Sequence, residues 1–310
     1  MKYGKKYLAV LLACLVCAVL LWGCGKDAEG ETEQDPQQQE QEIPVETSDS
    51  IECCDGSRTL RFEKKENGTW VWKDDETFPL DQAYIEEMLA TAREVLALTP
   101  AESSGELSDY GLEDTQRYLT LTGEDGQAVT YYLGDLTEGG CYYMRRAGDE
   151  SNQIYIAPET LTAQVSRSIY DMAVLPQLPE LTAENITAVT VALKDSETPV
   201  EIVPDGNGAW LWGQQDVTEK VNALLEALTG TGIVSCVDYQ PSSGAAAICG
   251  LDPASVTMTV AYVNGAGVDS TFVLRLGTAR GQQVHGTMQD DTTIYGVDGV
   301  LAAAVQALAA

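Results

Sequence analysis

Four short stretches of this chain recur in the same order and at nearly the same spacing. NGTWVW at 67–72 matches NGAWLW at 207–212, which lies 140 positions later. YGLED at 110–114 matches CGLDP at 249–253, which lies 139 positions later. Two more pairs follow this rule, namely YYLGD with LRLGT, at 131–135 and 274–278, and NQIYIAPETL with TTIYGVDGVL, at 152–161 and 292–301. Similarity at one offset is typical of a duplicated unit.

The chain of 310 residues is long enough for two domains of ordinary size. We therefore predict two homologous modules, the first at 58–172 and the second at 186–310. A Pro-containing linker at 173–185 joins them.

Each module has the same predicted order of strands and helices. Asn67-Gly68 is a hairpin turn between two strand-like runs. Apolar residues at helical spacing then follow Asp81 in the first module and Asp216 in the second, and both acids are suitable N-caps. Alternating strands and a last helix complete each module. The pattern predicts an α+β fold, in which each module is a mostly antiparallel sheet with helices packed on one face.

The first residues have the pattern of an export signal. Residues 1–6 contain three lysines, and residues 7–22 contain no charge. That apolar run is shorter than the roughly 20 residues of a membrane-spanning helix. Leu21-Trp22-Gly23-Cys24 then resembles the lipobox of bacterial lipoproteins. The resemblance implies that 1–23 is a signal peptide and that Cys24 becomes the lipidated N-terminus. The protein would be anchored on the extracytoplasmic face of the cell membrane; the alternative is a signal anchor with an incidental cysteine.

Residues 24–57 read as a tether between this anchor and the first module. The stretch 27–50 contains nine acids, five glutamines and no Lys or Arg. So few apolar residues cannot offset the entropy of ordering the chain, which predicts disorder.

The composition excludes several classes of function. A formal net charge of −30 repels nucleic acid, whose binding requires Lys and Arg to replace counterions. His285 is the only histidine, and the chain has no P-loop, no strand-linked G-x-G-x-x-G and no C-x-x-C. We predict neither a cofactor, a metal site nor a catalytic centre. The pattern favours free thiols but leaves disulfides open, such as Cys236–Cys249, among five residues: Cys53, Cys54, Cys141, Cys236 and Cys249.

One basic and aromatic stretch interrupts this acidic sequence. It is GGCYYMRRAGD at 139–149, with Tyr142, Tyr143, Arg145 and Arg146 at its centre. In a strand the two arginines lie on opposite faces. They can form surface ion pairs, or one of them can bind a ligand together with a tyrosine. The second module lacks them. The W-x-W pairs leave a similar choice between a core pair beneath the helix and an exposed platform for sugar rings.

The order of these motifs resembles a bacterial family known as domain of unknown function 4340, with one copy in each module. Its members are exported, membrane-anchored envelope proteins, and some are associated with gliding-type ABC transport systems. The resemblance implies a lipid-anchored, non-enzymatic binding or assembly scaffold, with an envelope or transporter protein as partner. The alternative is an extracellular sensor or binder of a small ligand or glycan in a cleft between the copies. A hydrolase is the weakest interpretation.

Overall fold

The computed structural model of this chain describes residues 48–95, 98, 100, 101, 105–149, 151, 153–230 and 232–310. The predicted signal peptide, Cys24 and the predicted tether up to residue 47 lie outside the described residues.

The first sheet has seven strands, in the order β3-β2-β1-β4-β5-β6-β7, and every pair is antiparallel. Tight turns join several of the neighbouring strands. In one of them Gly68 has a φ of 84°, and the Thr69 N–H donates to the Asn67 side chain at 3.0 Å. The strands are β1 (Ser48–Asp55), β2 (Thr59–Lys64), β3 (Trp70–Trp72), β4 (Arg117–Gly123), β5 (Ala128–Leu136), β6 (Tyr142–Arg146) and β7 (Tyr155–Ile156).

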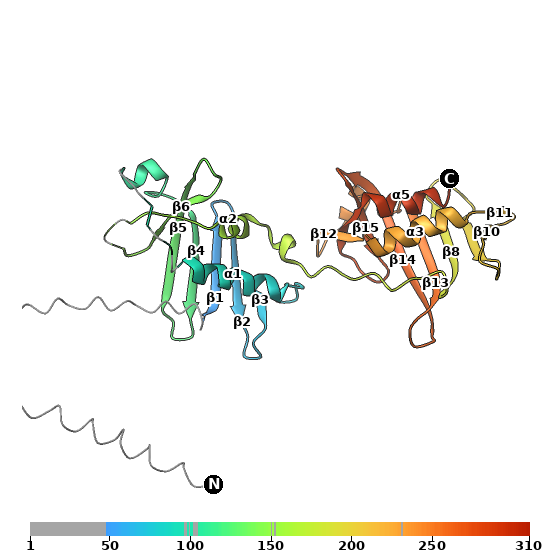
Figure 1. Cartoon of the computed structure of the whole chain (residues 1–310), viewed down its shortest axis with the longest axis horizontal. Coiled ribbons are helices and arrows are strands. Elements are labelled where there is room, and N and C mark those ends of the chain that lie inside the picture. The colour runs from blue at the N-terminus through green and yellow to red at the C-terminus, as the bar shows by residue number, and fades with distance from the viewer. Residues whose placement is uncertain are drawn as a thin grey trace, which may run out of the picture. The chain divides into compact units, whose positions relative to one another are not determined.

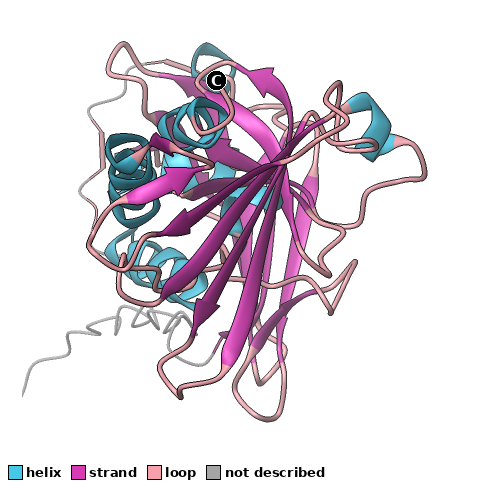
Figure 2. Ribbon diagram, turned by 90° about the vertical axis from the view of Figure 1, so that its right-hand side faces the viewer, coloured by secondary structure: helices cyan, strands magenta, loops and turns pink. Residues whose placement is uncertain are grey.

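Helices cover one face of this sheet. Figure 1 shows α1 (Gln82–Val95) and α2 (Glu159–Ser166) over its strands, and Figure 2 shows most of the helices to one side of the strands. Ile85 and Met88 of α1 are fully buried and join one core with Ile51, Phe62 and Leu121 of the sheet. Two short 3-10 helices, η1 (Leu107–Tyr110) and η2 (Ile169–Met172), complete this part of the chain.

The second sheet has nine strands and its own core. Their order is β11-β10-β9-β8-β13-β14-β15-β16-β12, again with antiparallel pairs. The helices are α3 (Thr218–Gly230), α4 (Ala245–Ile248) and α5 (Gly299–Ala307), and α3 and α5 lie over the strands in Figure 1. The strands are β8 (Ile186–Leu193), β9 (Val200–Pro204), β10 (Trp210–Trp212), β11 (Gln215–Asp216), β12 (Ile233–Asp238), β13 (Val256–Val263), β14 (Asp269–Arg280), β15 (Gln283–Met288) and β16 (Ile294–Asp298). The predicted α+β class with mostly antiparallel sheets is confirmed.

The two sheets agree in strand order and in register. Without β11 and β12, the second sheet reads β10-β9-β8-β13-β14-β15-β16, which is the order of the first sheet position by position. Five pairs of facing residues in the first sheet each have a counterpart in the second. Phe62–Trp72 corresponds to Ile202–Trp212, Ile51–Phe62 to Val189–Ile202, Ile51–Leu121 to Val189–Val260, Leu121–Val129 to Val260–Phe272, and Met144–Tyr155 to Gly286–Tyr295.

The sequence-based prediction is wrong at the end of the tether. Ser48–Asp55 is not disordered but forms β1, which lies between β2 and β4 in the interior of the first sheet. Ile51 and Cys53 point into the core, while the acids of this strand stay near the surface, where Arg61 pairs with Glu52 at 2.7 Å. The high acid content of 27–50 led to a prediction of disorder and masked the alternation of buried and partly exposed residues in β1. Within the described residues, the first folded part therefore begins at residue 48 and not at 58.

Candidate functional site

The W-x-W hairpins have mainly a structural role. Trp70 and Trp210 are 4% and 3% exposed and belong to the two cores. Each is tied to the start of the next helix, because the Trp70 N–H donates to Gln82 Oε1 at 2.8 Å and the Trp210 N–H donates to Thr218 Oγ1 at 2.9 Å. The core interpretation is confirmed for these two rings, whereas Trp212 is 36% exposed.

The basic and aromatic stretch forms β6, at the end of the first sheet near β7. Arg146 pairs in register with Tyr131, and Arg145 pairs with Tyr132. Side chains alternate along a strand, so the two arginines lie on opposite faces, as predicted. Within the described residues neither of them forms an ion pair.

In place of ion pairs, aromatic ring contacts form on both faces of this strand. Two of these contacts lie on the face of Tyr143 and Arg145. The Arg145 guanidinium lies 4.7 Å from the centre of the Tyr132 ring, and its Nε donates to the Leu112 carbonyl at 3.3 Å. Tyr143 packs edge-on against Tyr110, with ring centres 4.9 Å apart. These contacts fix the segment that contains η1 and the YGL motif against the sheet.

On the other face, Arg117 at the start of β4 lies over the Tyr142 ring, at 5.6 Å, and its Nη1 donates to the Gly134 carbonyl at 3.3 Å. Arg146 adds a favourable charge near Asp149. The pKa of that carboxyl is lowered, chiefly by hydrogen bonds from Ser151 and to a smaller extent by Arg146. The four predicted site residues therefore lie together in one strand but divide between the two faces of the sheet.

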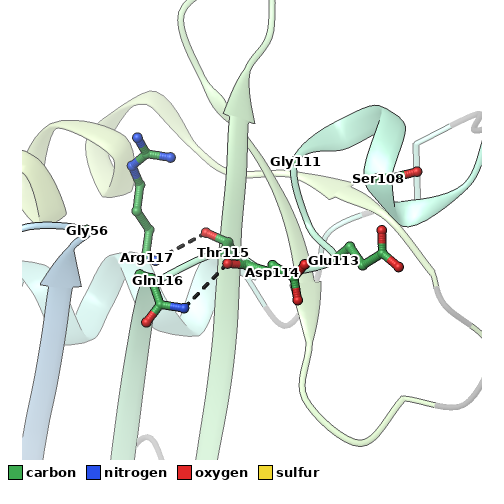
Figure 3. Close-up of a pocket in the computed structure, with 8 residues that line it drawn as sticks. All are labelled: Gly56, Ser108, Gly111, Glu113, Asp114, Thr115, Gln116 and Arg117. Atoms are coloured by element: carbon green, nitrogen blue, oxygen red, sulfur yellow. Dashed lines mark hydrogen bonds between the residues drawn. The ribbon is translucent and has the colours of Figure 1, made fainter.

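A hollow of about 500 Å³ opens beside the segment that runs from η1 to the start of β4 (Figure 3). The side chains of Glu113 and Arg117 point in different directions, and Gln116 turns back to donate to the Asp114 carbonyl at 3.4 Å. Such divergent groups offer separate hydrogen bonds to a surface rather than a closed site for one small molecule. The lining residues are Gly56, Ser108, Gly111, Glu113, Asp114, Thr115, Gln116 and Arg117.

The recurring GL and LG motifs form one structural unit in each part of the chain. A Cβ atom on Gly134 would collide with the Tyr110 carbonyl oxygen, and one on Gly277 would collide with the Cys249 carbonyl oxygen. The glycine of the strand thus allows the backbone of the GL segment to approach the sheet closely. This close approach explains why both motifs recur together.

A second hollow, of about 490 Å³, lies between η2, β12 and the turn that joins β14 to β15. We call it the junction pocket, because residues on both sides of the linker line it. Sequence reasoning missed it, since its three segments lie far apart in the chain and none contains a recognisable motif. Its lining residues are Ser168, Tyr170, Asp171, Ser235, Cys236, Val237, Arg280, Gln282 and Gln283.

Two buried thiols, those of Cys53 and Cys236, are not activated. Cys53, Cys54, Cys141, Cys236 and Cys249 are all free. Burial raises the pKa of the Cys53 thiol to about 12 and that of Cys236 to about 11, so both stay protonated at neutral pH. Burial, together with the charge of Arg280, lowers the pKa of His285. In the described part of the chain, no group of three or more His, Cys, Asp or Glu residues is arranged to hold a metal ion.

Residues 70–253 match the model of a family described as Domain of unknown function (DUF4340). The chain belongs to this family. The DUF4340 match runs without interruption from β3, through the predicted linker, to the loop after α4. It is one match that contains both W-x-W motifs and both GL motifs, so it does not show one copy per module.

Two other comparisons give no relative. Neither the search of the curated proteins nor that of the solved structures found a match. Among the helices that the structure describes in this DUF4340 protein, none is both long and apolar enough to cross a membrane.

Proposed function

We propose that this protein is a lipid-anchored cell-envelope protein that acts as a non-enzymatic scaffold for binding or assembly, with a membrane ABC transport system as one candidate partner. The anchor rests on the charged start, the uncharged run and the LWGC stretch at 21–24. Cys24 would carry the lipid. The ABC transport partner rests on the family resemblance alone.

We also propose that the two sheets are copies of one duplicated module. The supporting observations are the matching strand order and the matching residue pairs in five pairs of neighbouring strands. Recurrence of the same close contact between a GL segment and a strand glycine adds to them.

The observation that carries a binding role is a difference between these sheets at matching positions. By register, Tyr132 corresponds to Arg275, and Arg145 corresponds to Thr287. The ring contacts around β6 are therefore particular to the first sheet. Duplicated modules must both keep what the fold needs, whereas a function can be limited to one of them. We therefore assign the binding surface for a partner to the face of β6 that carries Tyr143 and Arg145, with Tyr132 beside Arg145. Tyr142 and Arg146, on the opposite face, are not part of this surface.

The anchor is tested by expressing the full chain in a bacterium and separating membranes from soluble protein. The wild type is expected in the membrane fraction, with a diacylglyceryl group on Cys24 in the mass spectrum. Cys24→Ala is expected to lose both the modification and the cleavage. Cys14→Ala is the matched control, since it removes the cysteine of a second lipobox-like stretch at 11–14 and should behave as the wild type. A Cys24→Ala protein that is processed and membrane-bound as before would refute the anchor.

A second candidate function is an extracellular binder or sensor of a small ligand. The junction pocket favours it, since 490 Å³ lies in the range of small-molecule sites and residues from both sides of the linker converge there.

A further inference from the structure

The junction pocket contains hydrogen-bond donors that the protein itself does not use. Its one basic side chain, Arg280, forms no ion pair in the described residues. Gln283 accepts a hydrogen bond from Ser235 Oγ at 2.8 Å through its carbonyl oxygen, which leaves its NH₂ group as a donor. Gln282 is exposed beside them. These residues lie at the end of the pocket formed by the β14–β15 turn.

The carboxylate in this pocket, Asp171, already accepts two hydrogen bonds on one of its oxygens. Asp171 Oδ2 accepts from the Ser168 N–H at 2.9 Å and from the Ser168 hydroxyl at 2.8 Å, because the two residues form the capping box of η2. At the β14–β15 turn, the groups that can still form hydrogen bonds are the donors of Arg280 and Gln283. The negative field of Asp238 and Asp291 acts at Cys236, on the β12 side. An anionic group therefore fits best at the end of the pocket that contains Arg280.

We infer that the junction pocket binds a small carboxylate with a hydroxylated body, of the uronic or sugar-acid type, with its carboxylate on Arg280 and the Gln283 amide. One guanidinium matches the single charge and the planar fork of a carboxylate. A dianionic phosphate would need more cations, because this protein carries a net charge of −30. The body of the ligand lies among Ser168, Ser235 and Tyr170. Their hydroxyl groups donate to Asp171, Gln283 and Asp238, so their oxygens accept hydrogen bonds from sugar hydroxyls.

This inference rests on the second proposed function, the small-ligand binder, and is independent of the anchor. It is tested with the purified full chain in detergent, by titration calorimetry with glucuronate, galacturonate and gluconate. Glucose serves as the uncharged counterpart, acetate as the carboxylate without a body, and inorganic phosphate as the competing anion. We expect saturable binding of at least one sugar acid, with glucose and acetate at least about tenfold weaker.

Arg280→Gln should weaken sugar-acid binding roughly 10- to 100-fold, as expected for loss of a charge-assisted hydrogen bond. Arg280→Lys keeps the charge but loses the fork, and should lie between that variant and the wild type. Lys194→Gln is the matched control, because it removes one exposed positive charge of the second sheet outside the pocket, and it should bind as the wild type. Circular dichroism and the melting temperature confirm that each variant is folded.

Four results would overturn the inference: no sugar acid binds, glucose binds as well as glucuronate, phosphate binds more tightly than every sugar acid, or Arg280→Gln binds like the wild type. A weakening by Lys194→Gln equal to that of Arg280→Gln would also overturn it, since the effect would then be one of overall charge. If the pocket fails while membrane attachment still depends on Cys24, the anchored scaffold stands and the ligand-binding function falls.

Discussion

At the residue scale, two glycines have a specific packing role. Gly134 in β5 and Gly277 in β14 each face the carbonyl oxygen of a GL segment at a distance that excludes a side chain. Gly134→Ala must push the Tyr110–Gly111 backbone away from the sheet, and backbone yields less readily than a side-chain end. We expect a loss of about 1–3 kcal/mol in the free energy of unfolding, measured by urea denaturation of the full chain.

The control for this substitution is Gly139→Ala. The nearest atom to its new Cβ would be Thr137 Oγ1, at 3.6 Å, which is an ordinary contact. Its stability should stay within about 0.5 kcal/mol of the wild type. Equal effects of the two substitutions would show that the close approach at Gly134 does not determine stability.

The residue scale also shows how far the sequence could predict the site. The positions of Arg145 and Arg146 on opposite faces follow from strand alternation alone, and the structure confirms them. The partners of Arg145 do not follow, because Tyr132 and Leu112 reach it only through strand pairing and the fold of the YGL segment. The predicted surface ion pairs were therefore replaced by a ring contact and a backbone hydrogen bond.

At the element scale, β1 shows the limit of composition as a signal. A window dominated by Asp, Glu and Gln predicts disorder, but Ile51 and Cys53 alternate with polar residues and complete the interior of a sheet. The hairpins beside Asn67-Gly68 and Asn264-Gly265 were predictable, since their turns are local. The long-range pairing of β1 with β4 leaves no local signal in the sequence.

The importance of β1 can be measured with Ile51→Ala. Ile51 is fully buried and lies opposite Phe62 on one side and Leu121 on the other. Removal of its side chain leaves a cavity in the core, which should lower the free energy of unfolding by about 2–5 kcal/mol. Asp49→Ala, on the same strand but at a partly exposed position, should change it by less than about 0.5 kcal/mol. If Ile51→Ala is as stable as the wild type in urea, β1 is not part of the cooperative core.

At the scale of the whole molecule, a group of four aromatic residues joins the two parts of the chain. Phe78 is 4% exposed, and its ring centre lies 5.6 Å from Trp72, 6.3 Å from Tyr170 and 5.3 Å from Tyr239. Tyr239, which follows β12, also donates its hydroxyl to the Thr77 carbonyl at 2.7 Å. A residue from beyond the linker thus packs against the first core, and the uninterrupted DUF4340 match covers all four rings.

This arrangement also explains why the junction pocket escaped prediction. Its position depends on η2 lying against β12, and the strand at 233–238 was not predicted from the sequence. A site that depends on contacts across the linker requires the relative placement of both sheets, whereas sequence patterns predict each module by itself.

The aromatic group predicts that the two sheets unfold together. Aromatic pairs contribute about 0.5–1.5 kcal/mol each beyond their buried area, and Phe78 takes part in three of them. In the full chain, calorimetry should therefore give one unfolding transition for the wild type. Phe78→Ala should cost roughly 3–5 kcal/mol and separate the transition into two, because the link between the cores is lost while the second core is intact. Trp212→Ala removes an aromatic ring that is 36% exposed and not part of this group, so it should leave one transition. One unchanged transition in Phe78→Ala would mean that other contacts, such as Gln240 with Asp75 at 3.0 Å, are enough to couple the two sheets.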